Sequence, residues 1–183
     1  GVFYRQVMAE DAGGAAAIEL VANSDTPVPN PGACVPGTTF GSTAPPSAAG
    51  NRMVFVGFDN EDDPTCGGIY MAPLQPGSSL TTLVGLESMV PGQGNETFTQ
   101  LGEGLSYDGR FVGFWGAWGE QTKTVRLYCP EEGNRDRRDF CNNVGDFAPD
   151  LGDMNSICDD DTDDTDLCYQ EKEVPINQGI FVY

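Results

Sequence analysis

The chain contains one turn-and-strand unit twice, and this duplication constrains its fold more than any other feature. The clearer copy runs from Leu105 to Trp115, where a polar turn with Asp108-Gly109 leads into a strand of aromatic and β-branched residues. The same order occurs earlier, between Ala49 and Phe58. A chain that repeats a short turn and an aromatic strand is expected to stack similar β units.

Further landmarks recur in the same order around the two copies, at a period of roughly 60 residues that is typical of propeller blades or similar β-arrays. A Gly before an apolar–aromatic pair opens a strand at 1–4, 68–70 and 179–183. The other matched segments are 18–21 with 80–84, Val28-Pro29 with Val90-Pro91, Thr39-Phe40 with Thr97-Phe98, and Asn51-Arg52 with Gly109-Arg110.

These landmarks predict four segments: a first repeat at 1–67, a second at 68–128, a Cys- and Asp-rich insertion at 129–173, and a terminal strand at 174–183. The terminal strand either starts a further repeat or pairs with a neighbouring copy. An alternative makes 126–128 the start of a third, degenerate repeat. That region has no second Gly-Arg turn and no aromatic central strand, which favours the insertion.

The segment Ser106–Phe114, followed by Val125–Tyr128, resembles the Ser-x-Asp-Gly-x-x-apolar-x-Phe … apolar-Tyr repeat of secreted TolB-type and WD40-like β-propellers. Together with Val90-Pro91-Gly92 and Gly68-Ile69-Tyr70, it is similar to uncharacterised secreted propeller-like repeat proteins. The resemblance implies an all-β fold of antiparallel β-sheets in propeller-blade-like repeats, with a disulfide-stapled insertion. It implies no particular activity, because propellers host many. Two repeats are too few to close a ring of blades, and Gly50-Asn51 departs from the Asp-Gly pattern.

Six cysteines in an acidic, turn-rich chain favour disulfides and an oxidising compartment. Metal binding by cysteine is the weaker interpretation, because the chain has no CxxC pair and no histidine. Asn95-Glu96-Thr97 is a glycosylation sequon, and the start at Gly1 suggests a mature, processed or excerpted chain. We therefore expect an extracellular or cell-surface glycoprotein. Sequence-local pairing predicts the bridges Cys34–Cys66, Cys129–Cys141 and Cys158–Cys168.

The formal net charge of −19 disfavours nucleic acid and anionic membrane surfaces as partners, and it favours cations such as calcium. No apolar run approaches the roughly 18 residues of a membrane span. The candidate calcium loop lies between Cys158 and Cys168, and the alternative for it is a solvated acidic loop. It is not an EF-hand, because Asp164 stands where Gly is needed and Gln170 where Glu is needed. Its candidate ligands are Asp159, Asp161, Asp163, Asp164 and Asp166. A second acidic turn, Asp59–Asp63, is a weaker candidate.

Enzyme functions have little support. The lack of histidine removes Ser-His-Asp and Cys-His systems and the commonest zinc sites. Paired carboxylates of a glycosidase stay open, since any of the 28 Asp and Glu residues could meet in space. Trp115 and Trp118 could stack on a sugar ring or on a partner's surface, or pack between repeats.

Because the chain carries the same strand type near both ends, we predict that terminal strands pair with neighbouring copies, giving a filament or a ring. The predicted function is an extracellular structural module that assembles as a homo-oligomer or polymer. The alternative is a ligand- or carbohydrate-binding propeller, possibly hydrolytic, of which this chain is a fragment. The interaction residues that we expect are Trp115, Trp118, Phe3, Tyr4, Ile180, Phe181 and Tyr183.

Overall fold

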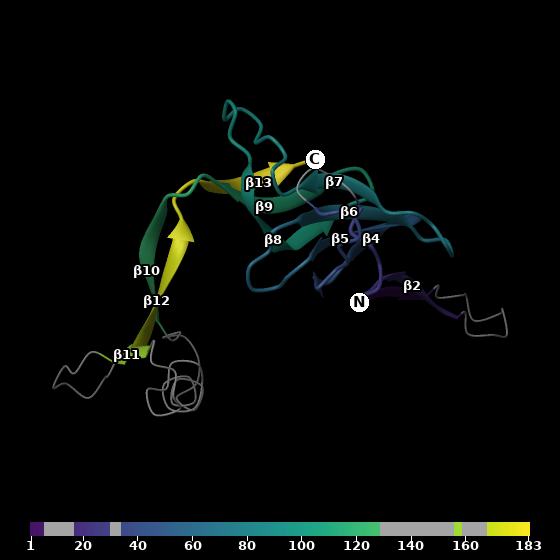
Figure 1. Ribbon diagram of the computed structural model, residues 1–183, viewed down its shortest axis with the longest axis horizontal. Helices are drawn as coiled ribbons and strands as arrows, with labels where there is room; N and C mark the ends of the chain where they lie inside the picture. Colours follow the sequence, from purple (N-terminus) through teal and green to yellow (C-terminus); the bar gives the residue numbers. More distant parts are fainter. Residues whose placement is uncertain (6–16, 30–33, 129–155, 159–167) are drawn as a thin grey trace. The chain divides into compact units, whose positions relative to one another are not determined.

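The computed structural model describes residues 1–5, 17–29, 34–128, 156–158 and 168–183 and is all-β, with antiparallel pairing throughout the described strands (Figure 1). The all-β prediction is confirmed. The chain divides into two compact units, which we name the first unit (Gly1–Glu120 with Asn177–Tyr183) and the second unit (Gln121–Ile176). No ring of sheets closes among the described residues, so the propeller interpretation stays a prediction.

Ten strands form three sheets in the first unit. The N-terminal sheet pairs β1 with β2, the middle sheet has β5 and β6 at its centre, and the C-terminal sheet has the order β13-β9-β8. The strands are β1 (Val2–Arg5), β2 (Ile18–Ala22), β3 (Ser42–Thr43), β4 (Ser47–Ala49), β5 (Arg52–Phe58), β6 (Gly67–Pro73), β7 (Thr81–Gly85), β8 (Phe98–Tyr107), β9 (Val112–Trp118) and β13 (Gln178–Val182).

The second unit contains β10 (Thr122–Tyr128), β11 (Ser156–Cys158) and β12 (Cys168–Pro175), paired in the order β10-β12-β11. The carboxylate of Glu173 accepts hydrogen bonds from the hydroxyls of Thr122 and Thr124 across the β10–β12 ladder. The sequence assigned β10 to the second repeat, and its partner is the strand that returns from the predicted insertion. Residues 129–155 and 159–167 of that insertion lie outside the described residues.

The strand registers of the first unit repeat residue by residue. In the middle sheet Phe55 pairs with Tyr70, Val56 with Ile69 and Gly57 with Gly68. In the C-terminal sheet Phe114 pairs with Phe181, Trp115 with Ile180 and Gly116 with Gly179. The β1–β2 and β6–β7 pairs share a bulge at the same place, after Val2 and after Ile69. β1, β6 and β13 are therefore the same strand of three successive sheets.

Each of the two larger sheets is built around three aromatic rings and one glycine. The rings of Phe40, Phe55 and Tyr70 have centroids 5.2 to 6.0 Å apart. A side chain at Gly57 would lie 2.6 Å from the Phe40 ring, so this strand position requires glycine. A side chain at Gly116 would lie at the same distance from the ring of Phe98, and this ring packs against Phe114 and Phe181. Edge-to-face packing of such rings adds to the stabilisation from burial.

This geometry corrects the sequence match at the turns by one residue. A two-residue turn, Gly50-Asn51, joins β4 to β5, because Ala49 pairs with Arg52. In the C-terminal sheet Tyr107 pairs with Val112, as Ala48 pairs with Met53 in the middle sheet, so the two turns have the same length. The Asp108 carboxylate accepts hydrogen bonds from the backbone N–H groups of Arg110 and Phe111, which stabilises the turn between β8 and β9. Asn51 thus occupies the place of Arg110, and the Gly-Arg match was wrong.

Two apolar clusters hold the three sheets together, because consecutive sheets pack face to face. The inner face of β1–β2, with Val2 and Ala22, packs on the aromatic face of the middle sheet, with Phe55 and Tyr70. The opposite face of the middle sheet packs on the aromatic face of the C-terminal sheet in the same way. The middle sheet contributes Val54, Val56, Ile69 and Val84, and the C-terminal sheet contributes Phe98, Val112 and Phe114. The same two kinds of face therefore meet twice.

Tyr70 carries an unpaired polar atom in this core. The side chain is fully buried, and no described residue forms a hydrogen bond with its hydroxyl. Burial, with a smaller effect of the Asp59 charge, strongly raises the pKa of Tyr70. The equivalent residues Phe3 and Phe181 lack the hydroxyl. Because a buried polar group without a partner costs about 1 to 3 kcal/mol, we expect Tyr70→Phe to raise the free energy of unfolding by about 1 kcal/mol, measured by urea denaturation. An unchanged or lower value would contradict this expectation.

Candidate functional site

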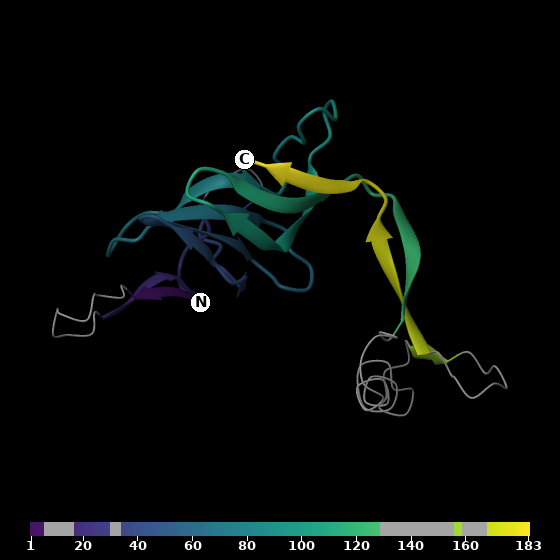
Figure 2. The same cartoon turned by 180° about the vertical axis from the view of Figure 1, so that it is seen from behind.

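Five of the predicted interaction residues lie on or next to β1 and β13, which are edge strands of their sheets (Figure 2), and the other two, Trp115 and Trp118, lie on β9. Phe3 and Tyr4 belong to β1, while Ile180 and Phe181 belong to β13. Tyr183 extends β13, since its backbone exchanges two hydrogen bonds with Val112. The terminal strands are therefore the candidate site, and the internal repeat shows what covers the equivalent residues elsewhere.

Ile180 is 75% exposed, although its equivalent in the middle sheet, Ile69, is 0% exposed. Ile69 of β6 pairs with Val84 of β7 and lies in the apolar cluster between the middle and C-terminal sheets. Ile180 has neither covering among the described residues. The preceding glycine shows the same difference. A side chain at Gly68 would collide with the carbonyl of Val84, whereas one at Gly179 would meet only Phe181 and Trp118, at 3.7 Å or more.

The outer face of β1–β2 shows the complementary exposure. Phe3 is 53% exposed, and its equivalents Tyr70 and Phe181 are buried and partly buried. Phe3 pairs with Leu20, and Arg5 pairs with Ile18, so these four side chains share one face. Ile18 and Leu20 are exposed. Tyr4 points to the other face and packs against the core cluster.

The two tryptophans have different surroundings. Trp118 is partly buried, and its ring packs on Phe181 at 6.0 Å between centroids. Trp115 lies on the other face of β9, where it pairs with Ile180 and covers Gly102. Its indole N–H donates a hydrogen bond of 2.9 Å to the side-chain oxygen of Gln178. Trp118 thus contributes to packing, while Trp115, Ile180 and the exposed Val182 form a partly open apolar face.

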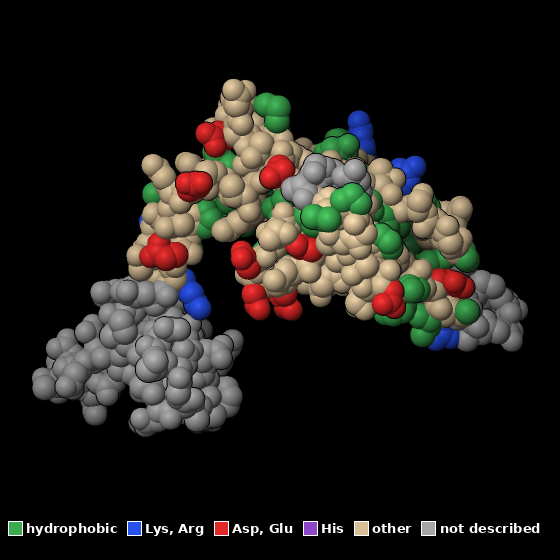
Figure 3. Space-filling model, in the orientation of Figure 1, with side chains coloured by type: hydrophobic (Ala, Val, Ile, Leu, Met, Phe, Trp, Pro, Cys, Tyr) green, Lys and Arg blue, Asp and Glu red, His purple; other side chains and the backbone are tan. Residues whose placement is uncertain are grey.

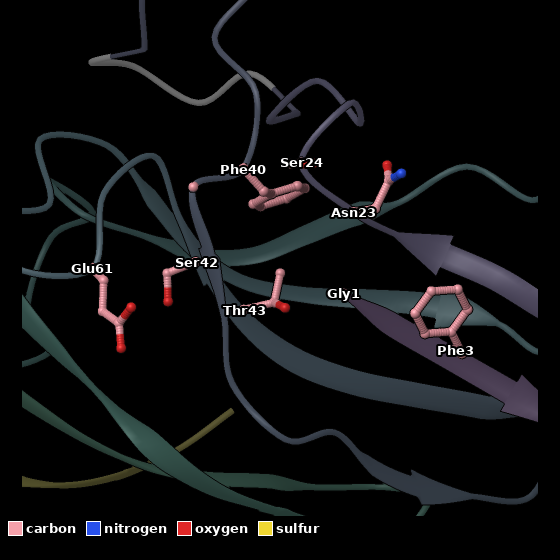
Figure 4. Close-up of a pocket in the computed structure, with 9 residues that line it drawn as sticks. Gly1, Phe3, Asn23, Ser24, Phe40, Ser42, Thr43 and Glu61 are labelled. Carbon is pink, nitrogen blue, oxygen red and sulfur yellow. The ribbon is translucent and has the colours of Figure 1, made fainter.

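A pocket of about 350 Å³ lies beside Phe3 (Figure 4). Asn23, Thr43 and Glu61 supply its polar side chains together with Ser24 and Ser42, and the Phe40 ring lines it as well. These groups offer hydroxyls, one amide and one carboxylate. No activated nucleophile or pair of carboxylates is among them, so the pocket supports hydrogen bonding to a small polar molecule, and we derive no reaction from it.

The acidic turn after β5 is organised by its own backbone. Asp59 accepts hydrogen bonds from the N–H groups of Thr65 and Cys66, each at 3.0 Å, and from the Thr65 hydroxyl at 2.5 Å. Partial burial alone would raise the pKa of Asp59, but these hydrogen bonds outweigh it and lower the pKa. In the part of the chain that the structure describes, no three Cys, Asp or Glu residues gather to hold a metal ion. The predicted calcium ligands Asp159, Asp161, Asp163, Asp164 and Asp166 lie outside the described residues.

The predicted bridge Cys34–Cys66 is confirmed, with 5.2 Å between the Cα atoms. It ties the segment before β3 to the Asp59 turn. Cys129 and Cys141 lie outside the described residues, so the bridge between them stays a prediction. The backbone register places Cys158 directly opposite Cys168 in the β11–β12 ladder, and the bridge between them stays a prediction. Asn95 is exposed in the loop between Val90 and Phe98, where a glycan would be accessible.

Red acidic side chains are spread over the face shown in Figure 3, in keeping with 28 Asp and Glu against 9 Lys and Arg. Among the described residues there is no helix with the length and apolar character to cross a bilayer. Exposed apolar side chains, by contrast, concentrate on the terminal strands and on β2, at Phe3, Ile18, Leu20, Ile180, Val182 and Tyr183.

Sequence reasoning missed three of these residues: Ile18, Leu20 and Val182. The alternation Ile18-Glu19-Leu20 already indicated a strand with one apolar face. It did not reveal that this face would be the uncovered one, because coverage depends on which sheet lies next. Comparison of the chain with protein-family models, with curated proteins and with solved structures finds no match.

Proposed function

We propose that this chain is an extracellular structural module that assembles with copies of itself through its terminal strands. We also propose that each of its three stacked sheets is a blade-like copy of one repeat. The observation that carries the proposal is the exposure of Ile180, which stands where the middle sheet buries Ile69 completely. An uncovered strand with a full set of core-type residues is a site for another sheet or strand.

Two further observations support assembly. The strands β1, β2 and β13, with the adjoining Tyr183, hold six of the ten large exposed apolar side chains among the described residues. The Cys34–Cys66 bridge stabilises the first unit and suits an oxidising, extracellular setting. The acidic loop between Cys158 and Cys168 would bind calcium and thereby offset part of the net charge of −19 that opposes association.

Sedimentation velocity of the full chain over a range of concentrations tests the proposal. We expect the average mass to rise with concentration, and negative-stain images to show regular particles that calcium strengthens and a chelator weakens. A chain that stays monomeric up to its solubility limit, with and without calcium, would show that the proposal is wrong.

The hydrogen bond between Trp115 and Gln178 supports a second candidate, a carbohydrate-binding module, because exposed indoles beside amides bind sugars. Ile180 and Val182 flank this indole, and aliphatic side chains offer a sugar no hydrogen bonds. The partner therefore fits a protein surface better. Saturable quenching of tryptophan fluorescence by soluble oligosaccharides, lost in Trp115→Ala, would favour the second candidate.

A further inference from the structure

The sheets of the first unit stack in a fixed order that leaves one face open at each end. In this order the aliphatic face of one sheet covers the aromatic face of the next. Val2 and Ala22 cover Phe55 and Tyr70 at the first junction. Ile69 and Val84 cover the Phe98 and Phe114 rings at the second. This packing of an aliphatic face on an aromatic face occurs twice within one chain, and we call each such contact a junction. A third junction of the same kind would therefore need one face of each type.

The C-terminal face, which we define as Trp115, Ile180 and Val182, occupies the place of the covering face in this order. Ile180 is the equivalent of Ile69 and of Val2, both of which are buried in junctions. Trp115 is the equivalent of Val56, which is also buried. Ile180 and Val182 have the residue type of an aliphatic covering face, Trp115 adds an indole where the middle sheet has Val56, and no described segment lies on this face.

The N-terminal face, which we define as Phe3, Ile18 and Leu20, occupies the place of the covered face. Phe3 is the equivalent of Tyr70 and Phe181, whose rings are covered or packed in the two junctions. All three side chains of this face are exposed. The two open faces thus correspond in position to the two halves of one junction, and they lie at opposite ends of the stack.

From these observations we infer that the C-terminal face of one copy packs on the N-terminal face of a second copy, head to tail. This deepens the proposed self-assembly and rests on it. Because the two faces differ, the contact is heterologous and leaves an open face at each end of a dimer, so that further copies can add. The third junction continues the stacking that the first two establish within the chain.

Charge permits this contact despite the acidic surface. The residues of β9 and β13 on the C-terminal face are Gly, Trp, Ala, Gln, Ile and Val, none of which is charged. On β1 and β2 the one charged residue beside the N-terminal face is Arg5, a cation in a chain with only nine Lys and Arg. No carboxylate of β1 or β2 faces the joint, because Glu19 pairs with Tyr4 on the inner face, and Glu61 is the carboxylate that lines the pocket beside Phe3. The remaining repulsion acts at longer range and is screened at physiological ionic strength.

Two lysine variants and their mixture test the inference by sedimentation velocity at physiological ionic strength. We expect Ile180→Lys, which blocks the C-terminal face, and Leu20→Lys, which blocks the N-terminal face, each to remain monomeric. Each variant keeps one intact face, so an equimolar mixture should form one-to-one dimers and nothing larger. Met89→Lys, at an exposed apolar residue outside both faces, should associate as the unchanged chain does.

The outcomes separate the inference from the proposed function. If the unchanged chain associates but both single variants do too, the stacking is wrong and self-assembly through another surface stands. If Leu20→Lys alone forms dimers and Ile180→Lys does not, the C-terminal face pairs with itself, which also overturns the head-to-tail order. A monomeric unchanged chain overturns both. Circular dichroism of each variant, matching the unchanged chain, confirms that the substitutions leave the fold intact.

Discussion

Gly68→Ala is expected to lower the free energy of unfolding by about 3 kcal/mol, because a methyl group there has no room. It would collide with the backbone carbonyl of Val84 and lie 2.7 Å from the Cα atom of Gly85. Both atoms belong to β7, so relief requires the β6–β7 pair to separate, which also disturbs the buried contact of Ile69 with Val84. Urea denaturation under non-reducing conditions measures the loss.

Gly179→Ala is the matched control, because Gly179 is the same position of the next repeat and an added methyl group meets nothing closer than 3.7 Å. We expect this variant to change the free energy of unfolding by less than about 0.5 kcal/mol. Equal losses at the two positions would contradict the equivalence of β6 and β13, or would show that a strand of this chain covers β13 in solution.

Removal of the Cys34–Cys66 bridge, by Cys34→Ser with Cys66→Ser, is expected to cost about 3 to 4 kcal/mol of stability. The bridge closes a loop with a sequence separation of 32 residues, and its loss restores the conformational freedom of that loop in the unfolded chain. Cys66 is also buried, so serine leaves a polar group in its place.

The single variant Cys34→Ser controls for the substitution itself. It removes the bridge but leaves Cys66 in the core, so it should lose most of what the double variant loses. Midpoints of urea denaturation for the unchanged chain and both variants give the comparison. A loss below about 1 kcal/mol in the double variant would show that the 34–66 loop is already restricted in the unfolded chain.

The sequence predicted the β class, the strand positions of 1–4, 18–21, 80–84 and 179–183, and the bridge Cys34–Cys66. These features depend on local signals: alternating side chains, turn residues, and the short separation of the paired cysteines. The turn match at Asn51-Arg52 was wrong by one residue because it aligned Arg52 with Arg110 by residue type, whereas the strand pairing aligns Met53 with Val112 and therefore Asn51 with Arg110.

The sequence alone determined the residue pattern of each strand. Glycine, an aliphatic residue and an aromatic residue follow one another three times, in Gly1-Val2-Phe3, Gly68-Ile69-Tyr70 and Gly179-Ile180-Phe181. Only the tertiary structure decided their different surroundings, in which Ile69 is buried between two sheets while Ile180 and Phe3 face outward. The physical reason is that burial belongs to a pair of surfaces and not to a residue. A strand pattern indicates which face of a strand is apolar, and the stacking of neighbouring sheets determines which of these apolar faces are buried.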